Sequence, residues 1–171
     1  MKKIAVFGKP GSGKSTLSLN LASATGVKLH ALDSIVYKKN GEPVDPETYH
    51  EKHENILSLN SWIIDGLGPI GSFNKRLDAA DTLIYIDLPY ILSYWLVTKR
   101  FFKGFVIKPE GWPDGSSVLK GTLESYKVLK LCPRFWNDNF MNKLENISTN
   151  KSLYVIRSIA ELNSFVDRYV K

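Results

Sequence analysis

The sequence predicts an α/β fold in which a parallel sheet lies between two layers of helices. Short apolar segments typical of strands alternate with longer helix-like segments, and a glycine-rich loop joins the first strand to the first helix. Strands that alternate with helices pair in parallel and are covered on both faces. The expected strands are Ile4–Gly8, Val27–Asp33, Ser61–Asp65, Thr82–Asp87 and Leu153–Arg157.

The expected helices have recognisable starts and ends. The helix after the glycine-rich loop reaches about Ala24, and Gly26 follows it as a C-terminal glycine. Pro46 begins a helix that reaches about Leu59, with Asp45 as its N-cap. The other expected helices are Ser72–Ala80, Pro89–Phe102, Thr122–Asn146 with a break near Pro133, and Ile159–Tyr169.

Length and composition favour one globular domain over residues 1–171. The single cysteine, Cys132, excludes an internal disulfide. The apolar run near the N-terminus is too short for a signal segment and ends in the glycine-rich loop, so we expect a cytoplasmic protein. The most apolar stretch, Thr82–Val97, contains Asp87 and Pro89 and is too short to span a bilayer, so we expect no membrane partner.

The formal net charge is +6. A basic balance is compatible with nucleic acid, a membrane surface or phosphate-rich small substrates. The basic residues are spread along the chain, apart from the cluster Lys99, Arg100, Lys103 and Lys108. An ordinary solvated surface explains this charge equally well, and the sequence contains no nucleic-acid-binding motif.

The glycine-rich loop matches the pattern G-x-x-x-x-G-K-[ST] over Gly8–Ser15. Glycines in such a loop let successive backbone N–H groups converge on phosphate oxygens, and the helix that follows directs its N-terminal dipole at the same anion. Lys14 is placed to reach the outer phosphates, and the Ser15 hydroxyl to bind Mg²⁺. The predicted nucleotide-binding residues are Gly8, Pro10, Gly11, Ser12, Gly13, Lys14, Ser15 and Thr16.

Three expected strands end in aspartate, which places carboxylates at the edge of the sheet where ligands bind. Asp65 follows a buried strand and precedes a glycine, which predicts a second ligand for Mg²⁺; a turn-starting Asp-Gly is the alternative. Asp33 is predicted to bind or deprotonate an acceptor hydroxyl, with a helix N-cap as the alternative. Asp87 precedes a helix and is at least as well explained as an N-cap.

His50 and His53 stand in the run His-Glu-Lys-His-Glu. Zinc-protease helices carry histidines at positions i and i+4, whereas these are at i and i+3. We therefore predict a solvated helix face here.

These motifs together resemble the adenylate kinase-like P-loop kinases, and more closely the small family of DNA topology modulation proteins, which is related to adenylate kinase. The resemblance covers residues 3–103 most clearly. It rests on Gly8–Thr16, His30–Asp33, Trp62–Gly66, Arg76–Thr82 and Tyr85–Pro89.

The resemblance implies a P-loop NTPase fold of three layers, α/β/α, with five parallel strands and a lid insertion at about residues 104–121. It also implies ATP as the donor and Mg²⁺ as the cofactor. Arg100 lies where such kinases place an arginine at the base of the lid, and Arg134 follows the lid. Together with Lys14 and Asp33, these two arginines form the predicted catalytic set.

The resulting hypothesis is an ATP-dependent phosphotransferase, a small kinase acting on a nucleotide, a nucleoside or another small acceptor with a hydroxyl or phosphate group. The alternative is a regulatory protein linked to DNA topology that binds or hydrolyses ATP. Adenylate kinases carry an arginine soon after the Asp-Gly pair, but the run Gly66–Ile70 has none, so AMP is not the expected acceptor. The acceptor, the choice of ATP over GTP and the oligomeric state do not follow from the sequence.

Overall fold

A computed structural model describes residues 1–36, 42–104 and 118–170. Within these residues the strands form one sheet with the order β2-β3-β1-β4-β5, and all neighbouring strands are parallel. The strands are β1 (Lys3–Gly8), β2 (Leu29–Ala31), β3 (Trp62–Asp65), β4 (Thr82–Ile86) and β5 (Ser152–Ile156). The predicted α/β fold with a five-stranded parallel sheet is therefore confirmed.

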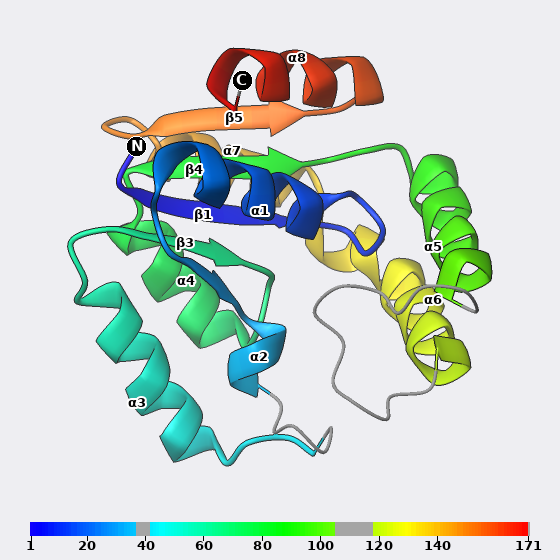
Figure 1. The fold of residues 1–171 in the computed structure, drawn as a ribbon, viewed down its shortest axis with the longest axis horizontal. Helices are drawn as coiled ribbons and strands as arrows, with labels where there is room; N and C mark the ends of the chain where they lie inside the picture. The colour runs from blue at the N-terminus through cyan, green and yellow to red at the C-terminus, as the bar shows by residue number, and fades with distance from the viewer. Residues whose placement is uncertain (37–41, 105–117, 171) are drawn as a thin grey trace.

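Helices cover both faces of this sheet and extend beyond its edges (Figure 1). Helices α1 and α8 pack on one face, α4 and α7 on the other, and α5 and α6 pack together beyond the carboxyl ends of the strands. The helices are α1 (Lys14–Thr25), α2 (Asp33–Val36), α3 (Pro46–Leu57), α4 (Ile70–Ala79), α5 (Tyr90–Gly104), α6 (Val118–Phe135), α7 (Asp138–Ile147) and α8 (Ile159–Tyr169). In the described parts of the chain, no helix combines the length and apolarity that a membrane crossing requires.

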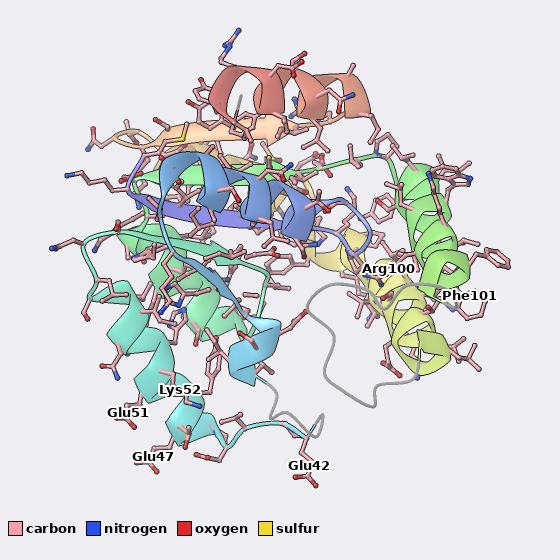
Figure 2. All side chains as sticks on the ribbon, in the orientation of Figure 1. Glu42, Glu47, Glu51, Lys52, Arg100 and Phe101 are labelled. Carbon is pink, nitrogen blue, oxygen red and sulfur yellow. The ribbon has the colours of Figure 1, made fainter. Side chains whose placement is uncertain are left out.

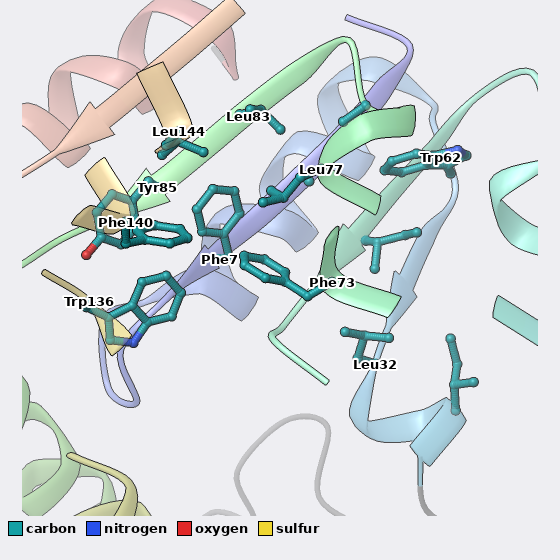
Figure 3. Close-up of a cluster of buried hydrophobic side chains, with 14 of the residues drawn as sticks. Phe7, Leu32, Trp62, Phe73, Leu77, Leu83, Tyr85, Trp136, Phe140 and Leu144 are labelled. Atoms are coloured by element: carbon teal, nitrogen blue, oxygen red, sulfur yellow. The ribbon is translucent and has the colours of Figure 1, made fainter. Parts of the chain in front are cut away.

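Alternate residues of the central strand β1 face two separate cores. Val6 faces the core shared with α1 and α8, whereas Phe7 faces an aromatic cluster shared with α4, α6 and α7 (Figure 3). The Phe7 ring centroid lies 5.2 Å from that of Phe73 and 5.6 Å from that of Tyr85. Trp136 stacks on Tyr85 at 5.1 Å, so one aromatic network holds these three helices to the end of β1 that carries the glycine-rich loop.

Several predicted element bounds are wrong in detail, among them the end of the fourth strand, which is Ile86 and not Asp87. The second strand ends at Ala31 and not at Asp33, because the chain turns into α2 at Leu32, whose carbonyl oxygen accepts hydrogen bonds from the Ile35 and Val36 amides at 2.9 and 2.8 Å. The break expected near Pro133 comes later, at Trp136–Asn137, where the Asn137 side chain caps α7.

The predicted lid at 104–121 is described only at its ends. Residues 105–117 lie outside the described part of the chain, and residues 118–121 form the first turn of α6.

The prediction of a solvated face around His50–His53 is wrong for His53. This side chain is fully buried on α3 and stacks on Tyr49, with ring centroids 5.7 Å apart. Burial, with a smaller contribution from the Arg76 charge, lowers the pKa of His53 to about 4. The buried His53 imidazole is therefore neutral near pH 7.

The buried His53 makes stability depend on pH. The unfolded imidazole takes up a proton below its ordinary pKa of 6.5, whereas the folded one does so only near 4. The stability is therefore complete above pH 6.5 and falls by up to about 3 kcal/mol as the pH drops toward 4. Urea unfolding from pH 7 to pH 4 should show a smaller loss for His53→Leu than for the wild type. His50→Leu, which replaces an exposed histidine on the same helix, should keep the wild-type loss; equal losses in all three proteins would contradict the prediction.

Candidate active site

The glycine-rich loop leaves the sheet at the carboxyl end of β1, where the chain has no room for a side chain. Gly8 has a φ of 148°, and a Cβ atom on it would lie 2.2 Å from the Ile86 carbonyl oxygen of β4. Gly11 and Gly13 also have positive φ values, 75° and 83°. The loop therefore depends on glycine for its backbone conformation and for its close approach to β4.

The N-terminus of α1 is left open by this loop. Its N-cap, Gly13, provides no side-chain hydrogen bond, whereas α3, α7 and α8 are capped by Asp45, Asn137 and Ser158. The first N–H groups of a helix have no partner within the helix. The amides at the start of α1 are thus available to an anion, and the helix dipole favours one there.

Lys14 lies at this open end and faces two carboxylates. It is half-buried, and its Nζ donates to the Lys9 carbonyl oxygen at 2.9 Å. Burial lowers the pKa of Lys14, and the charges of Asp65 and Asp33 oppose that effect. The ammonium group is therefore held between the loop and the two acids.

Asp65 ends β3 beside the first turn of α1. The carboxylate is 6% exposed and is hydrogen-bonded by the Ser15 hydroxyl. Burial raises the pKa of Asp65, and the charge of Lys14 opposes this. Its Oδ1 is buried and has no hydrogen-bond partner among the described residues, so the carboxylate keeps an unused ligand atom next to Ser15.

Asp33 and Arg100 complete the group from two other elements. Asp33 is exposed at the start of α2, and its charge acts on Lys14, Asp65 and Arg100. Arg100 extends from α5 toward α6, where its Nη2 donates to the Ser125 hydroxyl at 2.8 Å (Figure 2). Burial lowers the pKa of Arg100, and the Asp33 charge opposes this effect.

The remaining predicted residues are placed less centrally. Arg134 is exposed in the last turn of α6. Cys132, two residues earlier, has its thiol near Lys14. Two residues correspond to a rotation of about 200° around an α-helix, so Arg134 points away from Lys14. Arg134 is thus outside the group formed by Lys14, Ser15, Asp33, Asp65 and Arg100. In the loop, Ser12 is buried while Pro10 is half-buried, and Thr16 is exposed on the first turn of α1.

Arg76 has a local role that the sequence pattern did not indicate. Its fully buried guanidinium donates from Nη2 to the carbonyl oxygens of Gly66 at 2.9 Å and Leu67 at 2.7 Å. Burial lowers the pKa of Arg76 to about 10, although Asp65 lies close enough to oppose this. Arg76 therefore holds the turn that directly follows Asp65.

Comparison with known proteins gives a fold but no family. No protein-family model and no curated protein sequence matches the chain. A shikimate kinase from Bacteroides thetaiotaomicron superposes with a TM-score of 0.57 at 13% identity, covering 96% of this chain and 94% of that one. A shikimate kinase from Acinetobacter baumannii in complex with shikimate gives 0.54 at 14% identity, with coverages of 100% and 96%. A sugar kinase from Janibacter sp. HTCC2649 gives 0.51 at 15% identity, with coverages of 98% and 93%.

The chain has a P-loop kinase fold. In a sheet of this kind ligands bind outside the carboxyl ends of the strands. The group around Lys14 lies at that edge, where β1 and β3 end beside α1 and α2. The sequence did not indicate Lys9 and left Asp87 as an N-cap candidate, although the two form an ion pair beside this group, because the direction of a side chain in a loop has no periodic signal.

Loss of the Arg76 guanidinium should destabilise the protein. Arg76→Ala removes two hydrogen bonds to Gly66 and Leu67 and leaves a cavity, so we expect the free energy of unfolding to fall by about 3 kcal/mol. Urea unfolding at pH 7 measures this. Lys75→Ala, which replaces the exposed neighbour of Arg76, should change the stability by no more than about 0.5 kcal/mol. Similar losses for the two variants would refute a special role for Arg76.

Proposed function

We propose that this protein is an ATP-dependent phosphotransferase that acts on a small acceptor carrying a hydroxyl or phosphate group, such as a nucleotide or a nucleoside. The observation that carries the proposal is the convergence of Lys14, Asp65, Asp33 and Arg100 beside the open N-terminus of α1. A phosphate-binding helix end, a candidate metal ligand, a carboxylate and an arginine are the parts that phosphoryl transfer uses.

The residues present fit Mg²⁺ and a nucleoside triphosphate. Asp65 offers an unpartnered buried carboxylate oxygen, and the Ser15 hydroxyl is hydrogen-bonded to the same group, which is the oxygen chemistry that Mg²⁺ prefers. Mg²⁺ bound there would neutralise negative charge on the phosphates of the donor. The loop from Gly8 to Thr16 would bind those phosphates through its backbone amides and through Lys14.

Each of the protein's own charged groups then has a separate role in phosphoryl transfer. Lys14 leaves the Lys9 carbonyl to pair with the outer phosphates of the donor. Asp33, which is exposed and faces Lys14, orients the acceptor hydroxyl and accepts its proton. Arg100 offers planar paired donors to the transferred group. Arg134 lies outside this group, and a role for it in transfer stays a prediction.

The acceptor is identified by a phosphorylation screen with ATP labelled at the γ-phosphate. The panel contains nucleosides, nucleotides and small hydroxyl compounds, including sugars and shikimate because the similar structures come from a sugar kinase and shikimate kinases. A labelled product that depends on Mg²⁺ supports the proposal. Hydrolysis of ATP with no labelled product from any acceptor would contradict it and favour the regulatory alternative.

Lys14→Ala should remove most phosphoryl transfer without unfolding the protein. The variant loses the cation that faces the donor phosphates, so we expect kcat/KM to fall by about 100- to 1,000-fold. Circular dichroism checks the fold. The exposed Lys75→Ala is the control for loss of one positive charge and should keep wild-type turnover. Wild-type turnover in Lys14→Ala would exclude Lys14 from the donor site.

Asp33→Asn should impair transfer much more than it impairs donor binding. The amide cannot accept the acceptor proton, so we expect kcat to fall by about 100-fold or more while the Kd of ATP changes by less than about threefold. Turnover assays and titration with a fluorescent ATP analogue measure the two effects. Equal losses in transfer and in binding would assign Asp33 a structural role instead.

A further inference from the structure

The phosphate-binding loop contains a second lysine, Lys9, whose side chain takes a different direction from that of Lys14. Lys9 follows the last residue of β1 and Asp87 follows the last residue of β4; Gly8 and Ile86, which precede them, are paired in register. The two chains therefore leave the sheet side by side, and Lys9 and Asp87 meet at that point.

Lys9 is directed into the protein and not toward the ligand side of the loop. It is 2% exposed, its Nζ forms an ion pair with Asp87, and the ammonium lies 4.6 Å from the centre of the Tyr90 ring. Tyr85 hydrogen bonds to the same carboxylate. Cys132 of α6 also lies near Lys9, and its thiol is buried. An ion pair with Asp87, just after β4, and a cation–π contact with Tyr90 of α5 thus hold Lys9.

The backbone of Lys9 is central to the loop. Its carbonyl oxygen accepts hydrogen bonds from Lys14 Nζ at 2.9 Å and from the Ser12 amide at 3.3 Å. The Lys9–Asp87 pair therefore lies directly beside the part of the loop that holds Lys14.

The charge of Asp87 matters for the same site. A carboxylate at the start of a phosphate-binding loop repels a triphosphate, and its side chain is 28% exposed, so solvent screens it only in part. Lys9 cancels that charge through their ion pair. The loop then presents Lys14 and its amides to the ligand without an opposing negative charge beneath them.

We propose that Lys9 and Asp87 form a neutralised ion pair that sets the affinity of the loop for a nucleoside triphosphate, with Lys9 cancelling the Asp87 charge without touching the ligand. The inference rests on the proposed function only in requiring that the loop bind such a ligand. It predicts that the two residues affect affinity in opposite directions, which two residues that merely support the fold would not do.

The test is a double-mutant cycle on the Kd of Mg·ATP, measured with a fluorescent ATP analogue and no acceptor present. Lys9→Met leaves Asp87 unpaired, so we expect the Kd to rise about tenfold, the effect of one charge near a phosphate at an effective dielectric constant of about 20. Asp87→Asn should bind at least as tightly as the wild type. The double variant should return to within about threefold of the wild-type Kd.

The control is the pair Lys75–Glu54, an exposed lysine and carboxylate far along the chain from the loop. Lys75→Met changes the net charge by the same amount and should leave the Kd within about twofold, because surface charges are screened. Thermal unfolding of each variant separates loss of affinity from loss of fold. If Lys9→Met does not fold, Asp87→Asn alone decides: a Kd more than threefold weaker than that of the wild type overturns the proposal.

Other results would also overturn it. A double variant as weak as Lys9→Met would mean that the lysine acts independently of Asp87. Failure of the wild type to bind either ATP or GTP would remove the premise. The titration contains no acceptor, so the predicted order of affinities can hold even if the acceptor screen yields no product, and the two proposals fail separately.

Discussion

The contact between the ends of β1 and β4 constrains the whole site. A side chain on Gly8 would collide with the Ile86 carbonyl, and only this close approach lets the chain turn from the central strand into the loop that begins α1. The turn places the open end of α1 at the carboxyl edge of the sheet. It also brings Lys9 into an ion pair with Asp87 and places Lys14 where the charge of Asp65 acts on it. One packing constraint therefore positions both lysines relative to carboxylates.

The strand that leads into the phosphate-binding loop is tightly packed on both faces of the sheet. Phe7, one residue before Gly8, lies at the centre of an aromatic cluster whose rings come from β4, α4, α7 and the turn between α6 and α7 (Figure 3). Val6, on the opposite side of the same strand, packs in the core that contains Leu17 of α1. The loop therefore starts from a strand that is fixed on both faces, and binding residues on rigid elements hold their geometry better than those on free loops.

The charged groups of the site are held in surroundings that oppose their ionisation. Burial raises the pKa of Asp65 and lowers the pKa of Lys14, and each group partly compensates the other. Arg76 is buried beneath the next turn and uses only one nitrogen for its hydrogen bonds to Gly66 and Leu67 among the described residues. Such arrangements disfavour the folded state and are typical of functional sites, where charge must be available to a ligand.

The features that depend on neighbouring residues could be predicted from the sequence. The strand–loop–helix around Gly8–Thr16, the N-cap at Asp45 and the last helix, Ile159–Tyr169, follow from local patterns, and the structure confirms these elements. The α/β class followed in the same way, because alternation of strands and helices is a local property repeated along the chain.

Which charged residues meet could be known only from the three-dimensional packing. Lys9 and Asp87 are separated by 78 positions, and no periodicity links them, so the sequence could not show that one lysine of the loop faces inward while the other faces the carboxylates of the site. The sequence also could not show that His53 on α3 and Arg76 on α4 are fully buried. The direction of a side chain on a helix surface or in a loop depends on which elements pack against it. The strand order β2-β3-β1-β4-β5 determines which elements are neighbours.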